Sequence, residues 1–191
     1  MIRAHESGFQ GSADAMWTTT PGLGVIGRSA DCPLILICGS DDQGNGLWGF
    51  AHASWRSTIA GITTNLLREM TAAGLRPAEA QAIICPSAGP CCYEVGPEVR
   101  QQALTVLGPH ADAFFLPMAT GTAFDLWQAN CAQLEDAGLG TSQITVTGEC
   151  TICVGLDFPS HRRQKGMAKR FAAISGGYGQ GTGTPQQGTP R

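Results

Sequence analysis

The stretches SADCPLILIC at residues 29–38 and LWGFAHASWR at residues 47–56 decide the fold class of this chain. Each contains an apolar run of strand length, and such runs are typical of buried strands. A residue that can bind a metal stands beside each run: Cys32 precedes the first and His52 follows the second. The two stretches therefore predict two buried strands whose ends carry functional side chains.

The same pattern extends along the chain and predicts strands at residues 23–26, 32–38, 47–51, 82–85, 144–147 and 170–174. One helix is predicted from the helical spacing of Ile59, Ile62, Leu66, Leu67 and Met70, with Gly74 and Pro77 ending it. A second should begin at Pro97 and bury Val99, Ala103, Val106 and Leu107, and a third should cover residues 125–137, ended by Gly138. We expect an α+β fold, a single domain of mixed β-sheets covered by these three helices.

Composition limits the domain count and the class of partner. With 191 residues, 42% of them hydrophobic, the chain fits one domain, which we place at residues 1–174. Residues 175–191 are mainly Gly, Thr, Gln and Pro, so we expect a disordered tail there. A net charge of -3 without long charged runs argues against nucleic acid as a partner. We expect a monomer or a small homo-oligomer.

The sequence shows neither an export signal nor a membrane-spanning stretch, so we expect a cytoplasmic protein. The longest apolar stretch, residues 32–38, is far too short to cross a bilayer, and the N-terminus does not read as a signal peptide. The eight cysteines are then expected to be thiols or metal ligands rather than disulfides.

Cys32 and His52 are candidates for a metal site, since zinc accepts Cys sulfur and His nitrogen together and catalytic zinc sites use three protein ligands. Two alternatives stay open. A single histidine near an apolar strand is more often a hydrogen-bonded structural residue. The two residues could also form a metal-free nucleophilic dyad if His52 lowered the pKa of the Cys32 thiol.

Six motifs occur in one order along the chain: ADCP at 30–33, HASWRS at 52–57, GPCCYEVG at 89–96, DL at 125–126, CT at 150–151 and SHRR at 160–163. On these motifs the chain resembles the YfiH-type laccase-domain family, also called polyphenol-oxidase-like, over about residues 4–174. That family has a YfiH/CNF-like sandwich of sheets and helices. It also has a V-H-G element before A-D-A, and here AHESG at 4–8 precedes ADA at 13–15, which puts His5 in its place.

The resemblance implies a zinc ion, rather than copper, held by His5, Cys32 and His52. It also implies purine nucleoside phosphorylase activity accompanied by adenosine deaminase activity, with a nucleoside and phosphate as small-molecule partners. There are two departures from the family pattern. The usual N-terminal S-T-R-x-G-G segment does not occur in this sequence, and Ser54 and Ser57 replace two glycines, so we expect part of the pocket to differ.

Further residues receive expected roles from this chemistry. Phosphate favours guanidinium groups, for which the candidates are Arg56, Arg162 and Arg163. Proton-transfer candidates are His161, Asp125 and Glu94, although a carboxylate at a helix start is often a cap. The loop carrying Cys92 and Tyr93 is expected to contact substrate. Trp55 could stack on a base or belong to the core, and Arg170 could be structural.

Cys91 and Cys92 could be reactive thiols or could form a structural zinc site with Cys150 and Cys153. The second interpretation is disfavoured here because adjacent cysteines lack the usual two-residue ligand spacing. The loop is instead expected to shape the pocket.

Three other functions remain open: an amidase that edits cell-wall precursors, a copper polyphenol oxidase, and a metal-binding module without catalysis. The copper oxidase is disfavoured because multicopper centres use many imidazoles, whereas this chain has four histidines and no H-x-H motif.

Overall fold

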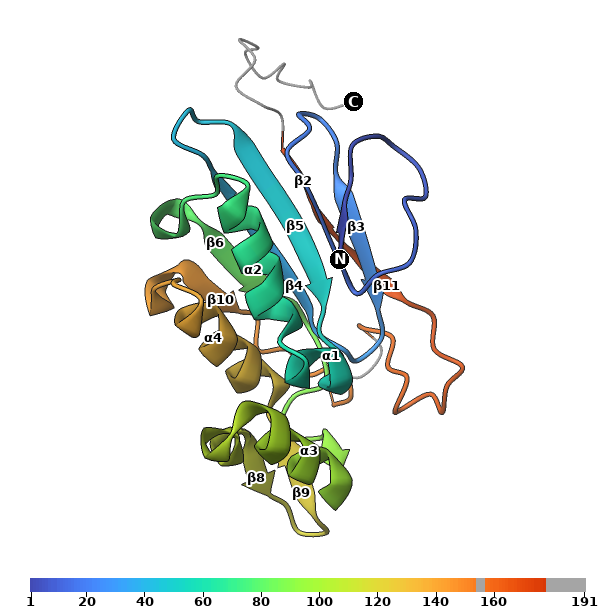
Figure 1. Ribbon diagram of the computed structural model, residues 1–191. Helices are drawn as coiled ribbons and strands as arrows, with labels where there is room; N and C mark the ends of the chain where they lie inside the picture. The colour runs from blue at the N-terminus through green and yellow to red at the C-terminus, as the bar shows by residue number, and fades with distance from the viewer. Residues whose placement is uncertain (154–156, 178–191) are drawn as a thin grey trace.

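A six-stranded sheet forms the centre of the molecule (Figure 1). The computed structural model describes residues 1–153 and 157–177. The strands of the sheet, in spatial order, are β1 (Ile2–Arg3), β2 (Ala15–Thr18), β5 (Gly46–His52), β4 (Leu34–Ser40), β6 (Gln81–Ile84) and β10 (Ile144–Val146). The central pairs are antiparallel, whereas β1 and β10 pair in parallel with β2 and β6. The mixed sheet agrees with the predicted fold class.

Helices α2 (Ile62–Ala72) and α4 (Leu126–Asp136) cover one face of this sheet (Figure 1). Leu66, Leu67 and Met70 of α2 are fully buried in the main core, because they recur at the spacing that places them on one helical face. Asp125 caps α4, its carboxylate accepting a hydrogen bond from the Gln128 amide at 2.9 Å.

The first predicted helix is divided in the structure into α1 (Trp55–Ile59) and α2. Gly61 separates them with φ +73°, a left-handed backbone conformation that favours glycine. The periodicity of apolar residues continues through Gly61, which is why the sequence pattern alone did not reveal the break.

The opposite face of the sheet is covered by β3 (Val25–Ser29) and β11 (Phe171–Ser175), which pair antiparallel. Val25, Leu34 and Phe50 are buried in the core between these layers. Ser175 pairs with Val25, so β11 extends one residue past the boundary predicted at residue 174. The rest of the predicted tail, residues 178–191, lies outside the described residues.

A second small sheet and α3 (Pro97–Leu107) form the lower part of the molecule in Figure 1. This sheet contains β7 (Glu94–Val95), β9 (Thr122–Phe124) and β8 (Phe115–Pro117), in that order. Helix α3 therefore does not cover the main sheet as predicted. It buries Val99 and Ala103 here, but Val106 remains 56% exposed, contrary to the prediction.

The part of the chain that the structure describes also has three short 3-10 helices: η1 (Pro77–Glu79), η2 (Pro109–Phe114) and η3 (Thr141–Gln143). Among the described residues, none of the helices combines the length and the apolar character needed to span a membrane. Strands β1, β2, β7, β8 and β9, each of two to four residues, were not predicted.

Candidate functional site

A pocket of about 360 Å³ opens where β4 begins and β5 ends. Its lining residues come from four regions far apart in the sequence: Arg28 to Cys32, His52, Tyr93, and His161, Arg162 and Arg170. Cys32, His52, Tyr93, His161 and Arg162 were all candidates from the sequence. The structure thus gathers five candidates around one cavity.

Strand pairing explains why Cys32 and His52 meet. Leu34 is the register partner of His52 across the antiparallel pair, so the start of β4 lies beside the end of β5. The His52 backbone amide donates to the Asp14 carbonyl, and His52 Nδ1 lies 3.6 Å from the Asp14 carboxylate. A carboxylate at Nδ1 is the usual orienting group of a functional imidazole, and it leaves Nε2 available.

A larger hollow of about 760 Å³ lies next to the loop of residues 6–14. It is lined by glycine, serine and apolar residues, with Glu6 and Asp14 as the charged groups and no Cys, His, Lys or Arg. The smaller pocket is the candidate site because it holds nearly all the reactive side chains.

Asp31 connects three segments of the pocket through hydrogen bonds. No role was assigned to this residue from the sequence alone. It is buried and has φ +86°, a strained conformation that Asp tolerates better than most residues. Its two carboxylate oxygens accept from the Thr151 hydroxyl and the Arg162 amide, each at 2.7 Å. Asp31 therefore joins the start of β4 to both of the later loops. Its left-handed conformation could not be read from the sequence.

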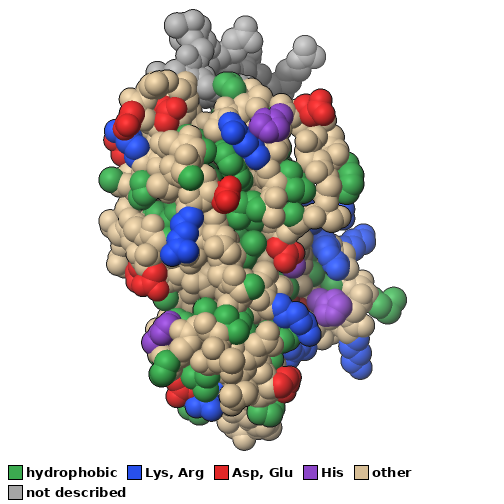
Figure 2. Space-filling view, in the orientation of Figure 1, with side chains coloured by type: hydrophobic (Ala, Val, Ile, Leu, Met, Phe, Trp, Pro, Cys, Tyr) green, Lys and Arg blue, Asp and Glu red, His purple; other side chains and the backbone are tan. Residues whose placement is uncertain are grey.

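The pocket is electropositive. Arg28, Arg162 and Arg170 supply three guanidinium groups, and Asp31, whose oxygens already accept hydrogen bonds, is the one carboxylate among the lining residues. Arg162 lies over the Tyr93 ring at 5.3 Å and donates to the Glu94 carbonyl. Figure 2 shows Lys, Arg and His side chains gathered on the lower right flank of the molecule. This arrangement suits an anionic ligand.

Arg28 was missed by the sequence interpretation, although a signal for it exists. On β3 the exposed positions alternate with buried ones, and Arg28 occupies an exposed position close to the ADCP motif. A charged residue on the outer face of a strand that leads into a motif can reach the same site.

Burial controls the chemistry of two pocket side chains. It raises the pKa of the Cys32 thiol to about 11, with a further rise from Asp31 and a smaller opposing effect of Arg170. Burial likewise raises the pKa of Tyr93 to about 12. A metal-free Cys32 therefore stays protonated near neutral pH, which argues against the metal-free Cys and His dyad.

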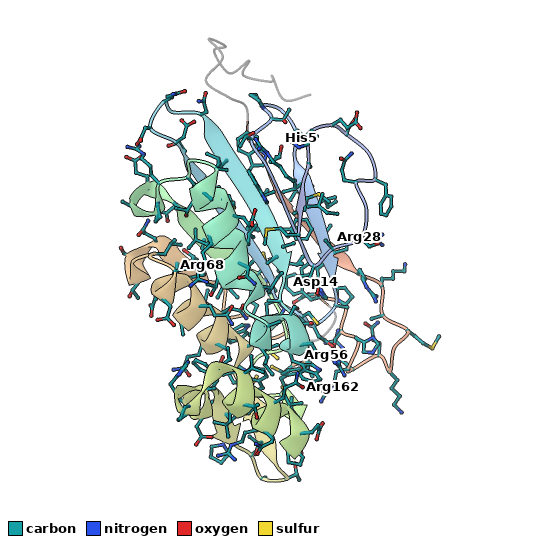
Figure 3. All side chains as sticks on the ribbon, in the orientation of Figure 1. His5, Asp14, Arg28, Arg56, Arg68 and Arg162 are labelled. Carbon is teal, nitrogen blue, oxygen red and sulfur yellow. The ribbon has the colours of Figure 1, made fainter. Side chains whose placement is uncertain are left out.

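The expectation that His5 joins Cys32 and His52 is not met. The Ala4 amide donates to the Trp17 carbonyl, so His5 lies beyond the Trp17 end of β2, whereas His52 lies at the Asp14 end (Figure 3). Four residues of strand place these ends roughly 13 Å apart. In residues 1–153 and 157–177, no group of three or more metal-binding side chains within mutual reach contains His5, Cys32 or His52.

Two other candidates have structural contacts instead of pocket contacts. Arg163 donates to the carbonyls of Thr151, Ile152 and Phe158, so its guanidinium is used in holding a loop. Asp125 is the N-cap described above and does not line the pocket. The predicted phosphate contact of Arg163 and proton transfer by Asp125 therefore have no geometric support.

The remaining candidates lie near the pocket without lining it. The Arg56 guanidinium lies over the Trp55 ring, 4.1 Å from its centroid, so one face of the ring is already covered by a side chain of the protein. Arg56 lies close to Arg162 in Figure 3, and both lower the pKa of Tyr93 against the larger effect of burial. The Glu94 carboxylate accepts from the Thr120 hydroxyl at 3.2 Å and is directed away from the pocket.

A cluster of cysteines lies next to the pocket, contrary to the expectation that these residues only shape a loop. The sulfur atoms of its members all lie within 4.8 Å of one another: Cys91, Cys92, Cys150 and Cys153. Cys150 and Cys153 have the two-residue spacing of metal-binding cysteines, a signal that could have found the cluster. Cys92 thus belongs to this group and is absent from the lining of the pocket.

The family model described as "Multi-copper polyphenol oxidoreductase laccase" matches residues 1–176. The chain belongs to this laccase-domain family. A crystal structure of YlmD from Geobacillus stearothermophilus has the same fold, with a TM-score of 0.78, 33% sequence identity, and coverage of 87% of this chain and 62% of that one. The resemblance inferred from the six motifs is thereby confirmed.

Two relatives of this chain are named for activities on nucleosides. The chain is 34% identical over 166 residues to "Purine nucleoside phosphorylase YlmD" of Geobacillus stearothermophilus, covering 85% of this chain and 59% of the relative. It is 32% identical over 164 residues to "Adenosine deaminase RL5" of an unknown prokaryotic organism, covering 85% of this chain and 61% of the relative. The chain thus spans about three fifths of the length of these curated relatives.

Proposed function

We propose that the pocket binds a purine nucleoside together with phosphate and that the chain is a purine nucleoside phosphorylase. The observation that carries the proposal is the charge of the pocket. Three guanidinium groups and two imidazoles surround a single carboxylate whose oxygens are already hydrogen-bonded. The names of the relatives support the same substrate class.

Phosphorolysis places specific demands on these residues. A phosphate oxygen attacks the anomeric carbon of the ribose, the bond from that carbon to the purine nitrogen breaks, and the purine leaves with the electron pair and takes up a proton. Arg162, Arg28 and Arg170 are assigned to the phosphate, which guanidinium groups bind in bidentate fashion. His161 is assigned the proton donated to the purine.

Tyr93 and Arg56 complete the assignment on the nucleoside side. Tyr93 is half-buried and already bears a cation on one face, which fits an aromatic wall for the base or ribose. Arg56 lies at the rim, where it would add to the attraction for phosphate. The Tyr93 hydroxyl can donate a hydrogen bond near neutral pH, and burial raises its pKa further, to about 12.

Zinc at Cys32 and His52 is a further part of the proposal, and the fit is partial. A thiolate and an imidazole are donors that zinc accepts, but a catalytic zinc uses three protein ligands. Among residues 1–153 and 157–177, His5 does not complete the set, so no step of phosphorolysis is assigned to a metal. Adenosine deamination is the second candidate reaction, because one relative is named for it.

One assay separates the candidate reactions. Purified protein is incubated with adenosine, with and without phosphate, and the products are separated by chromatography. Adenine formed only with phosphate supports phosphorolysis, inosine supports deamination, and neither product favours an amidase or a non-catalytic module. Arg162→Gln should lower kcat/KM for phosphate-dependent turnover, whereas Arg68→Gln on the exposed face of α2, outside the pocket, is the matched control.

A further inference from the structure

Four thiols converge at the junction of two loops beside the pocket. We refer to Cys91, Cys92, Cys150 and Cys153 as the four-cysteine cluster. Cys91 and Cys92 lie in the loop between β6 and β7, and the other two follow β10. Cys150 is buried and Cys92 half-buried, whereas Cys91 and Cys153 are exposed. An ion could therefore reach the sulfurs from solvent and be held against the protein interior.

The spacing of the sulfurs fits a tetrahedral ion. Zinc–sulfur bonds of about 2.3 Å in a tetrahedron put neighbouring sulfurs about 3.8 Å apart. The Sγ atoms of Cys91 and Cys153 are 3.7 Å apart, and every pair in the cluster lies within 4.8 Å. Shortening each sulfur–sulfur distance by about 1 Å or less would therefore bring all four sulfurs to the distances that one zinc ion requires.

Backbone contacts hold the two loops of the cluster together. Ser87 and Cys150 form a parallel bridge, and the Thr151 amide donates to the Ser87 carbonyl at 3.0 Å. The Gly89 amide donates to Cys150 Sγ at 3.3 Å, a hydrogen bond of the kind that stabilises metal-bound thiolate. A Cβ at Gly89 would lie 2.7 Å from Trp127 Cη2, so glycine allows this close approach.

Arg163 provides a compensating charge. Its Nη1 donates to the carbonyls of Thr151 and Ile152, which are the two residues between Cys150 and Cys153. Four thiolates around a divalent ion carry a net charge of −2, and a cation bound to the ligand loop offsets part of that charge. The contacts of Arg163 with Thr151 and Ile152 therefore give this arginine a role at the cluster, although it does not line the pocket.

We propose that the four-cysteine cluster binds one zinc ion and thereby locks together the two loops that form one wall of the pocket. Four thiols release their protons to solvent as they bind the ion, so no oxidant or reductant is required. Tetrahedral sulfur sites are characteristic of zinc or iron, and zinc requires no redox partner. The site is separate from Cys32 and His52, so it does not depend on the proposed nucleoside activity.

The loops that the ion would join both reach the pocket. Tyr93 follows Cys92 directly, and Thr151 follows Cys150 and donates to Asp31. An ion bound to the cluster would therefore hold Tyr93 and Thr151 in position, and Thr151 is the hydrogen-bond partner of Asp31. The ion acts as a positioning element for the pocket and has no contact with substrate.

The test uses the full chain, purified under reducing, oxygen-free conditions. Metal content is measured by mass spectrometry, and the metal-free protein is then titrated with Co²⁺ as a spectroscopic probe for zinc. We expect the visible bands of tetrahedral cobalt with several thiolates. The double variant Cys91→Ser/Cys153→Ser should lose these bands and about one equivalent of zinc relative to the wild type.

Matched variants place the metal within the chain. Cys38→Ser removes another exposed thiol, on β4, and should retain the metal and the bands. Cys32→Ser should retain the cluster zinc and the thiolate bands even where it loses metal from the pocket, so loss of the pocket metal and loss of the cluster metal are distinguishable. If Cys32→Ser abolishes the thiolate bands while the double variant keeps them, the proposal is overturned.

Two measurements on the wild type alone test the proposal even where a variant fails to fold. Zinc added to the reduced, metal-free chain should raise its melting temperature, and chelation should reverse the rise. Absence of both the shift and the cobalt bands overturns the proposal. A disulfide between Cys91 and Cys153 that persists in place of metal binding, or iron as the stoichiometric metal after aerobic and anaerobic purification, also overturns it.

Discussion

The pocket and the four-cysteine cluster share a boundary, but they gather their side chains in different ways. The pocket takes Cys32 and His52 from the ends of paired strands, Arg28 from β3, and Arg162 and Arg170 from the segment that precedes β11. The cluster takes four donors from two loops that a parallel bridge joins. In the described residues, the cluster holds four metal donors within mutual reach, whereas the pocket has no three donors within mutual reach and has a surplus of positive charge.

This difference shows how strand register and loop pairing act on distant residues. Register brings His52 to the start of β4, and the same rule carries His5 to the far end of β2. The cluster depends on short loops instead, so the unusual adjacency of Cys91 and Cys92 does not prevent convergence. The pocket thus presents mainly positive charge, and the cluster presents four sulfur donors.

The largest effect is expected at Asp31, which connects the two regions. Asp31→Ala leaves the Thr151 hydroxyl and the Arg162 amide without their acceptor and puts alanine at a positive φ. We expect a loss of about 2–4 kcal/mol in the free energy of unfolding, measured with urea. Asp42→Ala, an exposed aspartate in the turn between β4 and β5, should cost under about 1 kcal/mol. Equal losses in both variants would contradict the linking role of Asp31.

The variant Arg162→Gln tests whether the positive charge of the pocket binds phosphate. Its guanidinium lies over Tyr93, and its removal takes one of three such groups from the lining. We expect kcat/KM for phosphate-dependent turnover to fall about 10- to 100-fold, mainly through KM for phosphate, as for loss of a charge-assisted contact. An unchanged KM for phosphate would remove the anion-binding interpretation. The variant retains its backbone amide and therefore its bond to Asp31, so the stability change should be small.

The double variant Cys91→Ser/Cys153→Ser tests whether the cluster affects the pocket. Loosening the loop that carries Tyr93 should lower kcat/KM about tenfold, a change of about 1.4 kcal/mol in transition-state stabilisation. Cys38→Ser, far from both loops, should leave kcat/KM at the wild-type value. If the double variant loses zinc and keeps full activity, the cluster stabilises the fold without positioning the pocket.

Much of the fold could be predicted from the sequence, because long apolar runs and helical periodicity determine it. All six predicted strands exist, α3 begins at the predicted Pro97, and α4 begins and ends within about two residues of its predicted limits. The break at Gly61, the short strands and the position of α3 depend on tertiary packing, which local patterns do not encode. They could not be placed from the sequence for that reason.

For the site, motifs predicted which residue types matter better than where each one lies. Cys32, His52, Tyr93, His161 and Arg162 all reach the pocket. His5 does not, because a match to a motif carries no information about which end of β2 the histidine occupies. Arg163 sits one residue from Arg162, yet its guanidinium binds backbone carbonyls, a distinction that only three-dimensional contacts reveal.

The smallest effect is expected at Asp125, and it separates a helix cap from a catalytic acid. Asp125→Ala removes the acceptor for the Gln128 amide and should cost about 1 kcal/mol of stability. Asp125→Asn keeps an N-cap oxygen while removing the ionisable carboxyl, so it should restore stability and leave kcat at the wild-type value. Urea unfolding and steady-state kinetics of the two variants distinguish the roles. A stable Asp125→Asn protein with a lowered kcat would return Asp125 to the reaction and show that the active site extends beyond the pocket, toward α4.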